Sequence, residues 1–169
     1  MKIILFLTLL MIFMLTESVS ADVLVAEDSA NLKVNQTLED ERVIILQNYL
    51  EAKNSPFSDN AKQFIETADN YHLDWRLIPA ITGVESGFGK HIPKNSYNAY
   101  GWANGKYSFN SWDESIEIVG KTLKERYIDR GAVNINRIAK IYAPPSNTWA
   151  SKVKYFMNEI DPLPLTYDI

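Results

Sequence analysis

The stretch LIPAITGVESGFGK, residues 77–90, decides how the rest of the sequence is interpreted. Ile78, Ile81 and Glu85 recur at the spacing of one helix face, and Asp74 stands where it can cap such a helix. The glycines that follow Glu85 favour an end to the helix at that point. The sequence therefore predicts an apolar helix that carries a carboxylate on its apolar face, at its last turn.

Other segments with helical spacing lie on both sides of this helix. Ser111 and Glu114 form a capping box before the segment that contains Ile116, Val119, Leu123 and Tyr127, and Gly131 provides its stop. Aromatic residues and glycines over residues 97–109, with a turn at Asn104-Gly105, predict a small β-hairpin. The predicted fold class is mainly α, a bundle of about five to six helices with one hairpin. The further helical segments are Ala61–Tyr71, Ile116–Tyr127, Ile135–Tyr142 and Trp149–Ile160.

The beginning of the chain has the order of a secretory signal peptide. Lys2 precedes an apolar run, and small residues follow it up to Ala21. This run is shorter than the roughly 18–20 apolar residues that span a bilayer, so we expect a cleaved leader over residues 1–21 rather than an anchor. The protein is then exported, to the periplasm or the extracellular space, with no stable transmembrane segment after cleavage.

A spacer is predicted between the leader and the folded domain, over residues 22–55. Val43, Leu46 and Leu50 share a helix face that Thr37 can cap, and such a lone helix either docks onto the domain or remains a spacer. All seven glycines and all four tryptophans lie further along the chain. We therefore expect the domain over residues 56–160, followed by a tail over residues 161–169.

Composition excludes several functional classes. The 169 residues include 17 basic and 21 acidic side chains, a net charge of −4, which is opposite to the footprint of a nucleic-acid-binding protein. The absence of cysteine excludes disulfides, thiolate metal sites and a thiol nucleophile. With two histidines, a histidine-built metal site is also not expected. We predict no cofactor and no metal.

Glu85 is the carboxylate whose surroundings suit catalysis. A carboxyl group on an apolar helix face loses hydration, which raises its pKa toward the value that a general acid needs near neutral pH. The alternative is a glutamate that turns outward through the glycines after it, and the spacing alone does not separate the two. The residues that follow are rich in polar and aromatic side chains that suit sugar binding, from Asn95 to Phe109.

Four motifs together carry a resemblance to a known family. In chain order they are Val84–Gly89, Asn98–Trp102, Phe109 with Ser111–Ile116, and Ile141–Ala143 with Trp149–Val153. This arrangement resembles the bacterial glucosaminidase and lytic transglycosylase-like domains of the lysozyme superfamily, over roughly residues 56–160. The resemblance implies a lysozyme-like α+β fold, with the hairpin beside an active-site groove, and a peptidoglycan glycan strand as partner.

The resemblance also implies roles for individual residues. Glu85 matches the catalytic acid, and Tyr142 matches a tyrosine that points into the cleft near it. The substrate-binding residues implied are Ser86, Asn98, Tyr100 and Trp102. The activity implied is cleavage of β-1,4 bonds between amino sugars by an endo-β-N-acetylglucosaminidase. A lytic transglycosylase that gives 1,6-anhydro-muramyl products and a non-catalytic glycan-binding envelope protein remain the alternatives.

The mechanism depends on whether a second carboxylate assists Glu85. The candidates Asp113, Glu114 and Glu117 are explained as first-turn residues that the helix dipole favours, and Asp129 as a helix-end residue. We therefore predict a single acid, with the N-acetyl group of the substrate stabilising the developing charge, one of the exceptions to the two-carboxylate scheme. The sequence does not choose between water and the 6-hydroxyl of the sugar as the final nucleophile.

Overall fold

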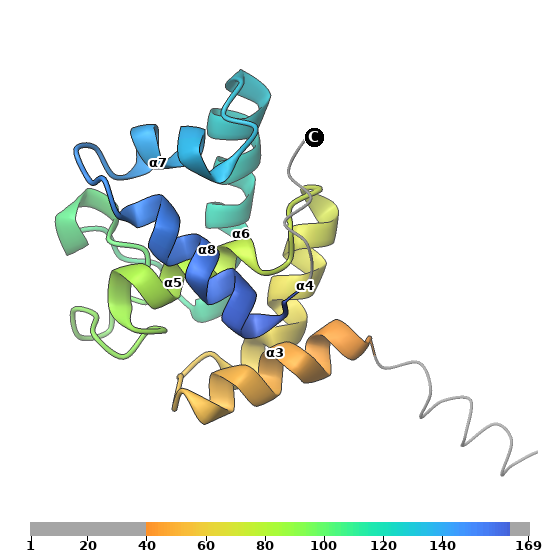
Figure 1. Ribbon diagram of the computed structural model, residues 1–169. Coiled ribbons are helices and arrows are strands. Elements are labelled where there is room, and N and C mark those ends of the chain that lie inside the picture. Colours follow the sequence, from red (N-terminus) through yellow and green to blue (C-terminus); the bar gives the residue numbers. More distant parts are fainter. Residues whose placement is uncertain (1–39, 163–169) are drawn as a thin grey trace, which may run out of the picture. The chain divides into compact units, whose positions relative to one another are not determined.

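Helices build the described part of the structure, as the spacing of apolar residues predicts. A computed structural model describes residues 40–162 (Figure 1). The predicted leader, the cap at Thr37 and most of the predicted tail lie outside these residues. In the described part the α-helices are α3 (Glu41–Ala52), α4 (Ala61–Asn70), α5 (Leu77–Ser86), α6 (Trp112–Thr122), α7 (Ile135–Tyr142) and α8 (Trp149–Ile160).

Short helical turns connect or extend these elements. They are the 3₁₀ turns η1 (Ser58–Asn60), η2 (Trp102–Gly105) and η4 (Ile128–Arg130), and the π turn η3 (Leu123–Tyr127), which continues α6. The predicted capping box at the start of α6 is confirmed, because the Ser111 hydroxyl accepts the backbone N–H of Glu114 at 3.1 Å. Gly131, in the left-handed region at φ 96°, follows η4 as the predicted stop. The mainly helical fold class is confirmed for the described residues.

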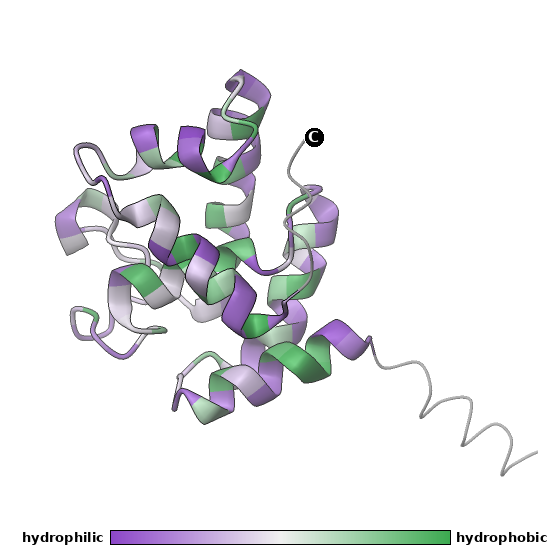
Figure 2. Ribbon diagram, in the orientation of Figure 1, coloured by the Kyte–Doolittle hydropathy of each residue, from purple (hydrophilic) through white to green (hydrophobic). Residues whose placement is uncertain are grey.

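Helix α5 lies in the middle of the core. Most of its residues are buried, and it packs chiefly against α8 and also against α4 and α6. Gly83 permits this packing, because a Cβ there would lie 2.6 Å from the ring of Phe88 and 3.0 Å from that of Phe156. In Figure 2 green and purple alternate along the helices, as expected where each helix has one buried face. The apolar segment that opened the sequence argument is therefore the centre of the fold.

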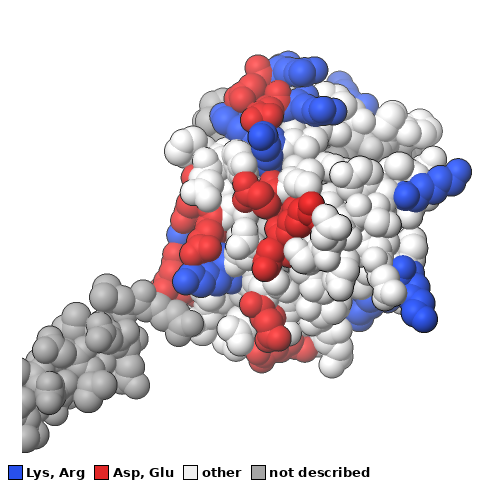
Figure 3. Space-filling view, turned by 180° about the vertical axis from the view of Figure 1, so that it is seen from behind, with Lys and Arg blue, Asp and Glu red and all other residues white. Residues whose placement is uncertain are grey.

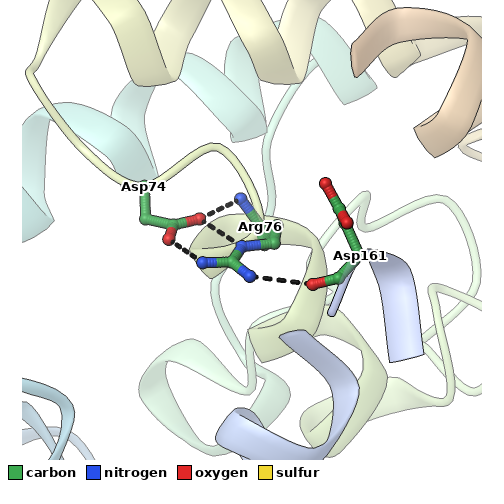
Figure 4. Close-up of polar contacts among 3 residues, drawn as sticks. All are labelled: Asp74, Arg76 and Asp161. Atoms are coloured by element: carbon green, nitrogen blue, oxygen red, sulfur yellow. Dashed lines mark hydrogen bonds and ion pairs between the residues drawn. The ribbon is translucent and has the colours of Figure 1, made fainter. Parts of the chain in front are cut away.

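A buried ion pair fixes the start of α5 against the end of α8 (Figure 4). The Asp74 carboxylate accepts the backbone N–H of Arg76 at 2.8 Å, in the turn before α5, and pairs with the Arg76 guanidinium at 2.5 Å. The predicted side-chain cap of α5 is not seen, because the residue that caps the helix is Arg76 and no side chain bonds to its first N–H groups. The same guanidinium donates to the backbone carbonyl of Asp161 at 2.8 Å. Because Arg76 is only 2% exposed, these bonds satisfy a charge that would otherwise be costly to bury.

Helix α3 is docked onto the domain, which settles the alternative that the sequence left open. Its predicted face of Val43, Leu46 and Leu50 is buried in the same core as α4, and the compact unit begins at Glu41. The Arg42 guanidinium also holds the Asp69 carboxylate through two hydrogen bonds of 2.8 Å. The helix therefore contributes to the core over residues that the sequence assigned to a spacer.

The prediction of a β-hairpin over residues 97–109 is wrong. No strand occurs within residues 40–162, and the predicted turn at Asn104 lies inside η2. The Asn98 carboxamide bonds to the backbone of the loop instead. It donates to the carbonyls of Trp102 and Tyr107, at 2.9 and 3.0 Å, and accepts the backbone N–H of Trp102 at 3.1 Å. A loop organised around one buried side chain replaces the pairing of two strands.

Among the described residues, none of the helices has the length and apolar character needed to cross a membrane.

Candidate active site

Glu85 occupies the last turn of α5, where the helix stops at Gly87. Gly87 adopts the left-handed conformation, with φ 59°, and its N–H bonds to the carbonyl of Thr82. The Ser86 hydroxyl lies 2.9 Å from the carbonyl oxygen of Ala99 and accepts the N–H of Gly89 at 2.9 Å. These bonds join the helix end to the loop that follows, so the position of Glu85 is set by both.

Two distant segments surround the Glu85 carboxyl group. The indole N–H of Trp149, at the start of α8, donates to Oε1 at 2.6 Å. The backbone of Gly101 approaches the other oxygen so closely that a Cβ there would lie 2.9 Å from Oε2, and Gly101 also has a positive φ of 70°. The loop and α8 therefore hold the carboxyl group from two sides and leave it half-buried.

This environment changes the proton affinity of the carboxyl group. Burial raises the pKa of Glu85 above its ordinary value, and the hydrogen bond from Trp149 opposes this effect in part because it favours the ionised form. The balance keeps the carboxyl group protonated to a higher pH than a solvent-exposed glutamate. That is the property expected of a general acid.

Tyr142, at the end of α7, lies beside this group. Its hydroxyl donates to the backbone carbonyl of Tyr100 at 2.8 Å, and its ring stacks on that of Trp149 with centroids 5.0 Å apart. Burial, together with the charge of Glu85, raises the pKa of Tyr142 far above its ordinary value. The phenol therefore stays neutral, and Trp149 connects it to Glu85 through a stack on one side and a hydrogen bond on the other.

Glu85 and Tyr142 both line a groove of about 1010 Å³. Its volume is at the upper end of the range typical of small-ligand pockets. The loop after α5 forms one wall with Gly101 and Trp102, and α6 with its continuation forms another. Aromatic side chains along the groove, which suit contact with sugar rings, are Trp102, Tyr107 and Tyr127.

The structure brings together four of the six predicted site residues. Glu85, Tyr142, Tyr100 and Trp102 line the groove. Tyr100 is only 1% exposed, and its backbone carbonyl accepts the hydroxyl of Tyr142. Its place at the groove is therefore chiefly that of a positioning residue.

Ser86 and Asn98 are placed differently from the other predicted site residues. Both are buried, with exposed fractions of 4% and 2%, and the side chains of both form hydrogen bonds with the backbone of the loop after α5. Their contact with substrate stays a prediction. What the structure shows is that they fix the loop that carries Gly101 and Trp102.

The other carboxylates considered as partners for Glu85 are engaged elsewhere. Asp113 accepts from the Asn60 carboxamide, Glu114 accepts from Asn110, and Asp129 pairs with Lys124. Glu117 accepts the hydroxyl of Tyr71 at 2.5 Å and that of Thr67 at 3.3 Å. None of these four carboxylates lines the groove. Among the described residues that line it, Glu85 is the one carboxylate.

Four residues at the site were missed by the sequence analysis. Trp149 belongs to a quoted motif but received no role, Tyr127 and Arg126 were seen only as parts of a helix, and Arg130 was not singled out. A tryptophan at the first position of a helix is a usable signal, because its indole N–H needs an acceptor when it is buried. Nothing in the local sequence identifies Glu85 as that acceptor.

No family model matches the chain, and a search of the curated proteins finds no match. Within residues 40–162 no group of three or more His, Cys, Asp or Glu side chains is arranged to hold a metal ion.

Proposed function

We propose that the protein is an exported peptidoglycan hydrolase of the endo-β-N-acetylglucosaminidase type, with Glu85 as its single catalytic acid. The observation that carries the proposal is the Glu85 carboxyl group. It is half-buried in a groove with aromatic walls, its pKa is raised by burial, and it has no second carboxylate beside it among the residues that line the groove.

The chemistry follows from that arrangement. Protonated Glu85 donates its proton to the glycosidic oxygen, and the bond from the anomeric carbon to that oxygen breaks. The carbonyl oxygen of the substrate's own N-acetyl group attacks the anomeric carbon and stabilises the charge that develops there. Water then adds to the anomeric carbon as the bond from that carbon to the N-acetyl oxygen breaks, and the Glu85 carboxylate accepts the proton that the water loses, which regenerates the acid.

Tyr142 and Trp149 serve this cycle by position. The Trp149 indole N–H stabilises the Glu85 carboxylate that exists between the two proton transfers, because a charge-assisted hydrogen bond is stronger than a neutral one. The neutral Tyr142 phenol donates a hydrogen bond to the Tyr100 carbonyl and keeps its proton, so we expect it to position the loop rather than to act as a base. Trp102 and Tyr107 would supply surfaces on which sugar rings stack.

The test is digestion of purified peptidoglycan by the full chain and by Glu85→Gln, with Glu66→Gln on the exposed face of α4 as a matched control. We expect the parent and the control to release fragments with reducing N-acetylglucosamine ends, and Glu85→Gln to lose at least roughly 100-fold in rate. Mass spectrometry of the products identifies the bond that is cut. Anhydro-muramyl ends would instead show a lytic transglycosylase. If the parent binds peptidoglycan but does not cleave it, the protein is a non-catalytic glycan-binding protein.

A further inference from the structure

The wall of the groove that α6 and its continuation form carries two arginines. Arg126 lies in the π turn η3 and Arg130 at the end of η4, and both line the groove together with Ile118, Thr122 and Tyr127 of the same segment. The groove is therefore lined by two guanidinium groups and one carboxyl group whose ionisation is disfavoured, although the chain as a whole has a net charge of −4. Its local charge is opposite to that of the molecule.

The π turn accounts for the position of Arg126. In an α-helix, residues four apart are rotated by about 40° around the axis, so two such steps from Ile118 would carry Arg126 about 80° away from its starting direction. A π turn has more residues per turn, which brings residues four apart back toward one line. Because η3 follows α6 directly, Thr122 and Arg126 stay on the groove side of the segment. Such π segments occur frequently at functional sites.

The two arginines also differ from the charged residues around them. Lys124 pairs with Asp129 at 2.9 Å, and Lys121 approaches Glu125 at 4.0 Å. In Figure 3 basic and acidic side chains accordingly lie side by side at the top of the molecule. Among residues 40–162 neither Arg126 nor Arg130 forms an ion pair or hydrogen bond through its guanidinium, so both are available to a ligand.

We propose that Arg126 and Arg130 form a subsite that binds a carboxylate on the glycan strand and thereby directs the groove to acidic amino-sugar polymers. This inference rests on the proposed function, since it names the substrate class of the same groove. A guanidinium offers paired N–H donors that match the two oxygens of a carboxylate. An acidic protein repels an acidic polymer at long range, so local cationic groups are needed to hold it.

A muramyl strand offers this chemistry from two sources. One is the lactyl carboxylate, which is free only where the peptide has been removed, and the other is the set of carboxylates on the attached peptide. Chitohexaose has the same β-1,4 amino-sugar backbone and no carboxylate. Three probes therefore separate binding of the sugar backbone from binding of each acid. They are chitohexaose, peptide-free strands and peptide-bearing strands.

The experiment measures dissociation constants by calorimetry for the three probes in the Glu85→Gln background, where the strand is not cleaved. Arg126→Gln/Arg130→Gln is compared with Lys121→Gln, which removes a cation from the same segment outside the groove. We expect the double variant to bind at least one acidic strand about tenfold more weakly, or about 1.4 kcal/mol, and chitohexaose unchanged. The loss should shrink as salt rises, because exposed ion pairs are screened. Loss on peptide-free strands identifies the lactyl carboxylate, and loss on peptide-bearing strands alone identifies the peptide.

Two results would overturn the inference and leave the proposed function standing. One is equal weakening for chitohexaose and the acidic strands, which would assign the guanidinium groups to neutral sugar atoms. The other is unchanged binding of all three probes by the double variant. If the Glu85→Gln chain binds none of the probes, the proposed function fails and the subsite with it. Thermal melting of each variant confirms that the exposed substitutions leave the fold intact.

Discussion

Replacing Trp149 with Phe tests how the Glu85 carboxyl group is held. The substitution keeps an aromatic ring for Tyr142 to stack on and removes the indole N–H that donates to Glu85 Oε1 at 2.6 Å. It also leaves space in a site where Trp149 is 3% exposed, which costs stability for a reason unrelated to the hydrogen bond. A double-mutant cycle with Glu85→Gln separates the two effects, because the lost volume is common to both backgrounds.

The size of the coupling follows from the chemistry of the bond. A hydrogen bond to a charged group contributes about 1.5–3 kcal/mol, roughly twice a neutral one. The carboxamide introduced by Glu85→Gln keeps a neutral acceptor for the indole, so the cycle measures only the part that depends on charge, about 1 kcal/mol. At pH 4 this part should vanish. The pKa of Glu85 lies above its ordinary value of 4.5, and the carboxyl group is then mostly protonated.

Urea unfolding followed by far-UV circular dichroism at pH 8 and pH 4 provides the free energies for the cycle. Trp112→Phe is the control, because Trp112 packs against Phe57 and Tyr97 and not against Glu85. A coupling below about 0.3 kcal/mol at pH 8, within the usual error of additivity, would refute the assigned bond. So would a coupling of the same size at both pH values, since it would then not depend on the charge of Glu85.

Three further predictions concern pH, the loop at Gly101 and the ion pair of Asp74 and Arg76. First, burial raises the folded-state pKa of Glu85, so protonated Glu85 stabilises the fold at low pH. That stability is lost as pH rises through the folded pKa. The Glu85→Gln variant should therefore unfold at a higher temperature than the parent at pH 8, and at a similar temperature at pH 4. Second, Gly101→Ala should lower the unfolding free energy by about 1–2 kcal/mol through its positive φ, and should move the Glu85 carboxyl resonance in ¹³C spectra; an unmoved resonance would contradict the contact with Oε2. Third, Arg76→Met should lower the free energy of urea unfolding by about 3–5 kcal/mol because it leaves the Asp74 carboxylate unpaired, whereas Arg76→Met/Asp74→Leu should recover much of the loss. Equal losses in both variants would argue against the role of the ion pair.

The sequence predicted the features that depend on local spacing. The apolar face of α5 and the capping box at Ser111 both use residues within a few positions of one another, so the pattern contains the interaction. The π turn was not predicted. Val119, Leu123 and Tyr127 are spaced by four residues, and that spacing fits an α-helix and a π turn equally well.

The prediction of a hairpin was wrong because backbone groups of the loop bond to a buried side chain, that of Asn98, rather than to a partner strand. Asn98 and Tyr107 are nine residues apart, and a search for alternating residues with a turn between them does not detect a carboxamide that bridges such a distance. The role of Trp149 was missed because its hydrogen bond spans an even greater distance along the sequence. Its acceptor, Glu85, lies 64 residues earlier in the chain.

The resemblance implied that Ser86 and Asn98 contact substrate, yet both side chains are buried beside the groove. Their hydrogen bonds to the loop explain this position. Ser86 bonds the end of α5 to the Ala99 carbonyl, and Asn98 accepts from the backbone of Trp102. Between these two attachments the loop is forced against the Glu85 carboxyl group, where Gly101 leaves no room for a side chain or for full hydration. The raised pKa of Glu85 is therefore a product of how the loop is fixed, and a side chain that never touches a ligand can still set the chemistry of the acid.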